Sequence, residues 1–249
     1  MNALWLELYK LRRKRLALMI ALFLAVELAW AYMSLSMSIA RNPDNAGWPA
    51  ALLLVASMNR LFLPILSAVI VSRICDMEHK GQTWKLLMAA SVRRSRIYAA
   101  KYAAACLLLA SAVALQTAGI AAIGLASGFR EAVPLMLLIR LAAGTLLTTA
   151  AVVALQQWVS LAVKNQAFSL ALGMLGSFVG LTAMLFPAPV RLWFIWSYYM
   201  DLSPVTYGYA SGALSYAHNE FGFQLPLLAL AMGAAAYIAG CVHVSRQEI

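Results

Sequence analysis

Residues 73–101 read RICDMEHKGQTWKLLMAASVRRSRIYAAK and form a charged segment within an otherwise apolar chain. The segment holds seven of the nineteen basic residues and two of the nine acidic ones. Long apolar runs precede and follow it, so we expect it to be a loop that is presented at a membrane surface. A loop with this mixture of charges, a glycine and a tryptophan is suited to contact a partner.

The composition of the rest of the chain predicts an integral membrane protein. Of its 249 residues, 63% are hydrophobic and only 11% are charged, and the mean hydropathy is +0.79. Soluble domains carry about 25% charged residues, so this chain could not cover itself with a polar surface in water. A spanning helix needs about 20 apolar residues. Six segments meet that length: 16–40, 49–72, 102–127, 134–163, 167–186 and 224–243.

Lysine and arginine concentrate at the termini and in alternate loops between these six segments, which all lie on one side of the membrane. If the N-terminus is cytoplasmic, fourteen basic residues lie on the cytoplasmic side and three on the outside, with Arg60 and Arg140 inside apolar segments. The positive-inside rule therefore predicts a multi-pass plasma-membrane protein with both termini in the cytoplasm. The net charge of +10 is explained by this topology and by contact with anionic lipid headgroups. A nucleic-acid partner is not expected.

Two further regions complete a single transmembrane domain over residues 1–249. Residues 1–15 place Leu4, Leu8 and Leu11 at helical spacing, with Glu7 and the basic residues expected elsewhere on the helix. This pattern predicts a short interfacial helix with its apolar face among the acyl chains. A simple positive anchor is the alternative. Residues 187–223 carry ten aromatic residues and predict one or two short re-entrant or interfacial helices, interrupted at Pro204. An ordinary aromatic belt with a loop is the alternative there.

Two charges fall near the predicted bilayer centre. Glu27 lies eleven residues into the first segment and Arg60 twelve residues from the cytoplasmic end of the second, so both sit at a depth of about 17 Å. An isolated charge at that depth is costly and a partner offsets part of the cost. We therefore hypothesise a Glu27–Arg60 salt bridge. The alternative is that one of the two lines a substrate or proton path.

The sequence has no pattern for catalysis or nucleotide binding. It contains no G-x-x-x-x-G-K-[ST], no H-E-x-x-H and no Cys/His cluster with zinc spacing. Cys75, Cys106 and Cys241 are interpreted as small apolar residues. The remaining acidic residues are dispersed, so no converging set of catalytic groups is predicted. We expect a protein that is not an enzyme and that holds no cofactor or metal, and any energy source must come from a partner.

The charged segment has an internal order that positive charge alone does not explain. Residues 76–87 begin acidic, break at Gly81 and continue as a short helix that Thr83 would cap. Trp84, Leu87 and Met88 then form an apolar edge. Such a cytoplasmic helix could dock in the groove of a soluble domain. The alternative, a solvated basic loop, explains the lysines and arginines but not the Glu-x-x-Gly-x-Thr-Trp order.

The run EHKGQTWKLLMAASVRRSRIYAAK resembles the cytoplasmic loop of ABC type-2 exporter permeases, and most closely the lantibiotic-immunity and bacitracin-resistance branch. One departure is Ala89-Ala90-Ser91, where that family commonly has a proline. The resemblance implies a protein of the bacterial plasma membrane with a coupling helix between spans two and three. It also implies a dimer of separate ATPase subunits that hold ATP and Mg, and a second permease, identical or paralogous. It assigns contacts with the ATPase to Glu78, Gly81, Thr83 and Trp84, and secondarily to His79, Lys80, Lys85 and Leu86.

Together these features predict an all-α permease of an ATP-driven exporter. The expected cargo is an amphipathic peptide or antibiotic taken from the membrane, as in immunity or drug resistance. Two other functions stay open. One is a non-transporting scaffold or sensor that recruits a cytoplasmic partner through the same loop. The other is an ion-coupled carrier that uses Glu27, which lacks companion acidic residues.

Overall fold

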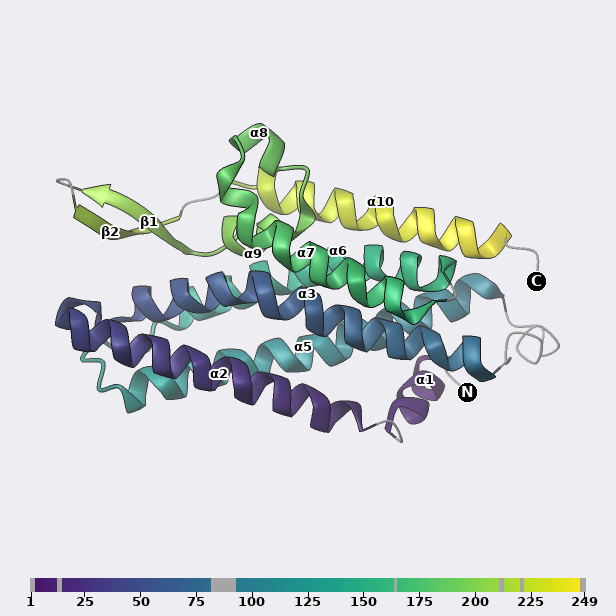
Figure 1. The fold of residues 1–249 in the computed structure, drawn as a ribbon, viewed down its shortest axis with the longest axis horizontal. Coiled ribbons are helices and arrows are strands. Elements are labelled where there is room, and N and C mark those ends of the chain that lie inside the picture. Colours follow the sequence, from purple (N-terminus) through teal and green to yellow (C-terminus); the bar gives the residue numbers. More distant parts are fainter. Residues whose placement is uncertain are drawn as a thin grey trace.

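The computed structural model describes residues 3–12, 15–81, 93–163, 165–210, 213–219 and 222–246 (Figure 1). Within them, six helices are long and apolar enough to cross a membrane. They are α2 (Leu16–Arg41), α3 (Trp48–Gly81), α5 (Arg94–Ala126), α6 (Leu135–Ala162), α7 (Gln166–Thr182) and α10 (Gln224–Arg246). The predicted helical membrane fold with six spans is confirmed, and most of the predicted boundaries agree within three residues.

The described parts of the charged segment, residues 73–81 and 94–101, are helical, which differs from the loop predicted over 73–101. Helix α3 continues to Gly81 and α5 begins at Arg94, so each extends more than two turns beyond its predicted apolar span. The physical reason is that arginine, lysine and glutamate are good helix formers. These residues continue the helix beyond the hydrocarbon layer into the polar headgroup zone. A prediction from the length of apolar runs ends where the apolar residues end, so it misses this part of the helix.

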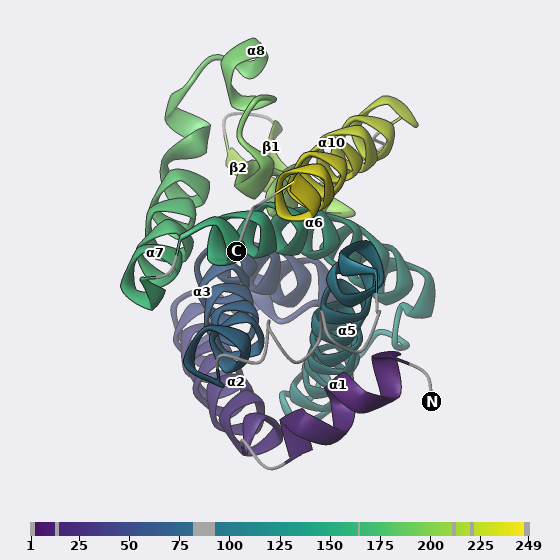
Figure 2. The same cartoon turned by 90° about the vertical axis from the view of Figure 1, so that its right-hand side faces the viewer.

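The spans run side by side, with α6 at the centre of the bundle (Figures 1 and 2). Helix α6 contacts α3 and α5 on one side and α10 and α7 on the other. Small residues allow this close packing. A side chain at Gly233 of α10 would collide with Ala151 of α6, and one at Gly173 of α7 would collide with Ala68 of α3. These glycines therefore serve packing within one chain.

Helix α1 (Ala3–Arg12) lies against α5 at the end of the bundle that also carries the C-terminus (Figure 1). Leu11 is buried, and Leu4 and Leu8 pack on the same core. The leucine face was expected among acyl chains, but it packs against the protein. Trp5 and Tyr9 are instead exposed and stack on each other with ring centroids 5.6 Å apart. The helix is therefore an integral part of the bundle.

The segment between α7 and α10 lies at the opposite end. It contains η2 (Ala183–Leu185), α8 (Ala188–Arg191), η3 (Ile195–Ser197) and α9 (Tyr198–Asp201), followed by β1 (Val205–Ala210) and β2 (Ala213–His218). The predicted short helices before Pro204 are present. The antiparallel hairpin, in which Val205 faces His218, was not predicted, although the run Val-Thr-Tyr-Gly-Tyr at 205–209 is typical of a strand. A short η1 (Pro43–Asn45) joins α2 to α3.

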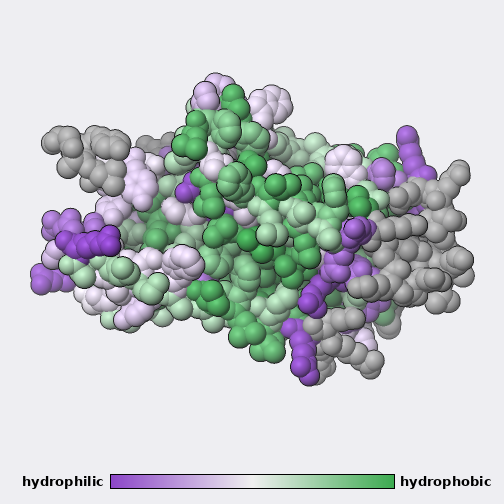
Figure 3. Space-filling view, in the orientation of Figure 1, coloured by the Kyte–Doolittle hydropathy of each residue, from purple (hydrophilic) through white to green (hydrophobic). Residues whose placement is uncertain are grey.

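The surface of the bundle is divided into an apolar middle and hydrophilic ends. In the space-filling view the middle of the bundle is green and apolar, and purple hydrophilic residues lie toward its two ends (Figure 3). Many side chains on this belt are large and exposed, among them Leu18, Leu22, Trp30, Leu115 and Phe178. A soluble protein rarely exposes so large an apolar surface. The belt therefore fits a bundle that is surrounded by lipid.

Candidate coupling site

A buried ion pair joins α1, α3 and α5 next to the charged segment. Lys101, two turns into α5, places its Nζ atom 3.1 Å from the Oε2 atom of Glu7 on α1. The same Nζ donates to the backbone carbonyl of Ile74 on α3 at 3.2 Å. Lys101 has 0% of its surface exposed, and Glu7 is also buried. We call Glu7, Lys101 and the Ile74 carbonyl the charge clamp.

The chain places Glu7 in the clamp by simple helical geometry. Glu7 follows Leu4 by three residues and precedes Leu11 by four, so it shares the face that packs on α5. Its Oε1 atom also accepts a hydrogen bond from Lys10 at 3.0 Å. Glu7 was expected away from the leucine face, which was wrong. The i, i+3 and i, i+4 spacing was the signal that could have identified it.

Four of the predicted coupling residues lie in the turn of α3 that follows the clamp. Glu78, His79, Lys80 and Gly81 form the last described turn of α3, and Glu78 follows Ile74 by four residues. The structure describes the backbone of these four residues and not their side chains. Their contacts with an ATPase stay a prediction. The other predicted contacts, Thr83, Trp84, Lys85 and Leu86, lie outside the described residues, as does the predicted coupling helix.

A second polar cluster crosses the middle of the bundle. The Nε2 atom of Gln116 on α5 is 2.7 Å from Glu27 Oε1 on α2 and 2.7 Å from Asn59 Oδ1 on α3. Asn59 in turn donates through Nδ2 to Thr145 Oγ1 on α6 at 3.3 Å. All four side chains are buried. We call them the polar chain. It connects four spans, and the amides inside apolar segments were a signal that the sequence analysis did not use.

The predicted Glu27–Arg60 salt bridge is not formed among the described residues, so that prediction was wrong. Glu27 is bonded to Gln116, and its Oε2 atom has no hydrogen-bond partner in the described structure. Arg60 instead lies within electrostatic range of Asp201 on α9. The predicted depths did not specify rotation about the helix axis. One step along a helix turns the side chain by about 100°, so Asn59 faces α5 while Arg60 does not.

Asp201 connects the parts of the segment between α7 and α10 to one another. Its Oδ1 atom is 3.1 Å from Arg191 Nη2. Burial raises the pKa of the Asp201 carboxyl, and the charges of Arg191 and Arg60 oppose that rise. Asn219, after β2, donates to the backbone carbonyls of Asp201 and Ser203 at 3.1 and 3.0 Å. The hairpin is therefore tied to the short helices by polar contacts.

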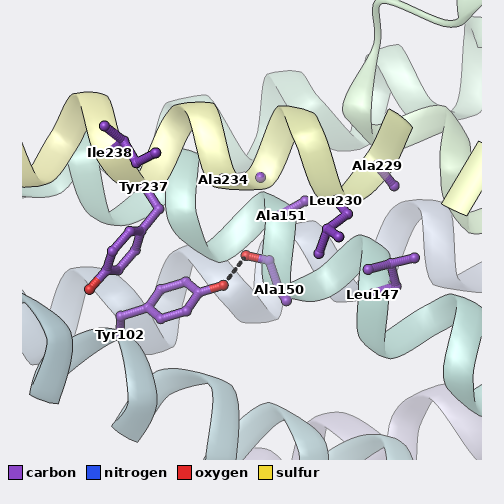
Figure 4. A pocket seen from close by; sticks show the side chains of 10 residues that line it. Tyr102, Leu147, Ala150, Ala151, Ala229, Leu230, Ala234, Tyr237 and Ile238 are labelled. Atoms are coloured by element: carbon purple, nitrogen blue, oxygen red, sulfur yellow. Dashed lines mark hydrogen bonds between the residues drawn. The ribbon is translucent and has the colours of Figure 1, made fainter. Parts of the chain in front are cut away.

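An apolar pocket of about 320 Å³ opens between α5, α6 and α10 (Figure 4). Tyr102 and Tyr237 line one end with ring centroids 4.9 Å apart, and Tyr102 donates to the carbonyl of Ala150 at 3.1 Å. Alanine, leucine, isoleucine and glycine residues line the remainder. The pocket can accommodate an apolar group, but it presents no set of acid, base and nucleophile.

The described residues contain no group of three or more His, Cys, Asp or Glu side chains placed to hold a metal ion. The polar features of the structure are therefore contacts between helices, with the clamp beside the charged segment and the polar chain within the bundle.

Comparison with known families gives an independent assignment. The sequence model of a family described as "ABC-2 family transporter protein" matches residues 3–180. The match covers α1 and all of the first four spans, and it extends into α7. A comparison with curated individual proteins gave no match. Members of the matched family are non-catalytic membrane components that work with an ATPase. The chain therefore belongs to the ABC-2 family of transporters, as a multi-pass membrane permease component whose family implies a partner ATPase.

Proposed function

We propose that this chain is the permease subunit of an ATP-driven exporter for amphipathic peptides or antibiotics, of the kind that confers lantibiotic immunity or bacitracin resistance. The family supports the permease role. The TWKLL run at 83–87 supports the branch by resemblance. The apolar surface and the pocket between α5, α6 and α10 support a cargo that enters from the lipid.

The charge clamp is the observation that carries the proposed mechanism. Residues 82–92 connect α3 to α5, and Lys101 bonds both α1 and the α3 backbone within one turn of Glu78. A force on the loop would therefore act on three helices together. In this proposal, ATP and Mg bind to a dimer of ATPase subunits. Their closure pushes on the loop and changes the tilt of the spans.

The proposal assigns the contacts with the ATPase to Glu78, Gly81, Thr83 and Trp84, with His79, Lys80, Lys85 and Leu86 around them. The basic residues at this end of the bundle support a cytoplasmic location for it and for both termini. The complete transporter would hold two permease subunits, identical or paralogous. The scaffold function is the competing proposal, and it predicts partner binding without ATP-driven flux.

Glu78→Ala tests the proposed coupling. We expect normal membrane insertion and yield, with transport-stimulated ATP turnover reduced severalfold, because the acidic contact with the ATPase is lost. The matched control is Glu131→Ala, an exposed acidic residue beyond the opposite end of α5, which should leave turnover unchanged. The measurement is vanadate-sensitive ATPase activity of the purified complex in proteoliposomes. Unchanged turnover in the Glu78 variant at normal expression would contradict the coupling assignment.

Flux distinguishes transport from a scaffold role. Proteoliposomes that contain the permease and its co-purified ATPase are supplied with ATP, and the movement of labelled bacitracin or a lantibiotic out of the bilayer is followed. ATP-dependent movement supports the exporter. An ATPase that binds the permease but drives no movement of either peptide would favour the scaffold. If ATP turnover still responded to other amphipathic compounds, the result would instead indicate an exporter with a different cargo.

A further inference from the structure

A groove lies between α2 and α3 on the half of the bundle that carries α1 and the charged segment. Its volume is about 560 Å³, within the range of about 300–1,000 Å³ that is usual for ligand sites. Leu18, Leu22 and Val26 of α2 and Phe62 of α3 contribute to its apolar wall. Two arginines, Arg15 and Arg73, complete the lining.

The apolar wall is a stripe along one side of α2. Leu18, Leu22 and Val26 recur every four residues, and each has more than half of its surface exposed. Side chains at this spacing follow one face of a helix and form a continuous strip. The strip runs from the N-terminal end of α2, next to Arg15, toward the middle of that helix. An extended hydrocarbon chain fits a strip of this shape.

The two arginines give the groove a charged end. Arg15 precedes the first turn of α2, and Arg73 is near the end of the apolar part of α3. Both are exposed, and neither guanidinium has a hydrogen bond or ion pair within the described structure. The described lining of the groove contains no acidic residue. Its two cations repel each other, so an anion between them would stabilise both. Guanidinium groups bind phosphate oxygens in paired, charge-assisted hydrogen bonds.

We propose that this groove is a binding site for one anionic phospholipid of the surrounding leaflet. The phosphate lies between Arg15 and Arg73, and an acyl chain follows Leu18, Leu22 and Val26 to Phe62. The combination of paired cations at the polar end and a purely apolar wall matches a lipid in both charge and shape. Because Arg73 precedes Glu78 on α3, the bound lipid would connect α2 to the helix that leads into residues 82–92.

The site does not depend on which cargo is exported or on whether the chain transports at all. It is tested by binding alone. The full-length protein is purified in mild detergent, stripped of lipid and titrated with phosphatidylglycerol or phosphatidylcholine of the same acyl chains. Bound lipid is counted by native mass spectrometry. We expect tight binding of phosphatidylglycerol and weak binding of phosphatidylcholine.

Removal of the charges should weaken the site in a graded way. Arg15→Gln and Arg73→Gln should each reduce the affinity for phosphatidylglycerol about fivefold, and both together about 25-fold, since a basic residue near an anionic surface contributes about 1 kcal/mol. The matched control is Arg96→Gln. Arg96 is an exposed arginine in the first turn of α5, at the same end of the bundle, and it does not line the groove. It should leave the affinity unchanged.

The apolar wall is tested separately. Leu22→Trp should fill the groove and lower the binding of phosphatidylglycerol, whereas Leu115→Trp, at an equally exposed position on α5, should not. These variants keep both arginines, so they test the site even if the double arginine variant is poorly expressed. Equal binding of the two lipids to the wild type, or wild-type binding of phosphatidylglycerol by both the double arginine variant and Leu22→Trp, would overturn the proposal.

Discussion

Two buried glutamates, Glu7 and Glu27, occupy very different environments in this protein. Glu7 lies in the charge clamp, where both carboxylate oxygens accept hydrogen bonds from lysine, Lys10 at 3.0 Å and Lys101 at 3.1 Å. Glu27 lies in the polar chain, where one oxygen accepts from the neutral amide of Gln116 and the other has no partner in the described structure. Glu7 therefore has positively charged partners, whereas Glu27 has only a hydrogen bond from a neutral amide.

The difference shows how polar groups connect helices at two depths of one bundle. The clamp concentrates its energy in a single buried pair, so loss of one partner leaves an uncompensated charge. The polar chain spreads weaker hydrogen bonds over α2, α3, α5 and α6. Each of its members contributes less. Mutations in the two regions should therefore differ in size and in how far a second mutation restores stability.

The largest effect is expected in the clamp. Glu7→Ala should lower the free energy of unfolding by about 3–5 kcal/mol, because Lys101 would remain buried without its counter-charge. The double variant Glu7→Leu/Lys101→Met should recover most of that loss, since apolar residues can replace a buried pair. Thermal unfolding in detergent measures both. The control is Lys10→Ala, whose side chain is partly exposed. A Glu7 variant no less stable than this control would exclude the clamp as a stabilising contact.

An intermediate effect is expected at the centre of the polar chain. Gln116→Leu leaves Glu27 Oε1 and Asn59 Oδ1 without their hydrogen-bond donor. The free energy of unfolding should fall by about 1–3 kcal/mol for each buried group left unpaired. The double variant Gln116→Leu/Glu27→Leu should cost less than the sum of its parts, because the orphaned carboxylate is gone. Thr117→Val is the control, since that hydroxyl bonds only within α5. Additive losses in the double variant would argue against the Gln116–Glu27 contact.

The smallest effect is expected at Glu27 itself. Glu27→Gln removes the charge but retains an oxygen that can accept a hydrogen bond from Gln116. The free energy of unfolding should therefore change by less than about 1 kcal/mol. Membrane yield and thermal stability provide the measurement. The corresponding change in the clamp, Glu7→Gln, should be much more destabilising, because it removes the charge that faces Lys101. If the two glutamine variants behaved alike, the contrast between the regions would not hold.

Several structural features could be predicted before the fold was known. The six spans follow from apolar runs, because the cost of placing each residue in the bilayer is largely local and accumulates along the segment. The short helices before Pro204 were likewise indicated by aromatic residues. The hairpin at 205–218 was missed although its alternating pattern was present. Glu7 was misplaced although its spacing from Leu4 and Leu11 indicated the buried face.

Other features could not be predicted because they depend on packing between distant segments. The pairing of Glu7 with Lys101 joins residues 94 positions apart, and Gln116 meets Glu27 across 89. Matching depth suggested Arg60 as the partner of Glu27, but depth does not specify which face of each helix meets its neighbour. Close packing specifies those faces: a side chain at Gly119 of α5 would collide with Leu28 of α2, so these two helices meet along the face that brings Gln116 to Glu27.

The local pattern of residues was therefore sufficient to specify a six-span membrane protein with its basic charge gathered at one end, since hydropathy and charge act on each segment separately. The partners of the buried polar groups were specified only when the helices packed. Adjacent residues on α3 show the reason: Asn59 enters the polar chain while Arg60 faces the charge of Asp201. A rotation of about 100° between neighbours assigns them to different parts of the bundle.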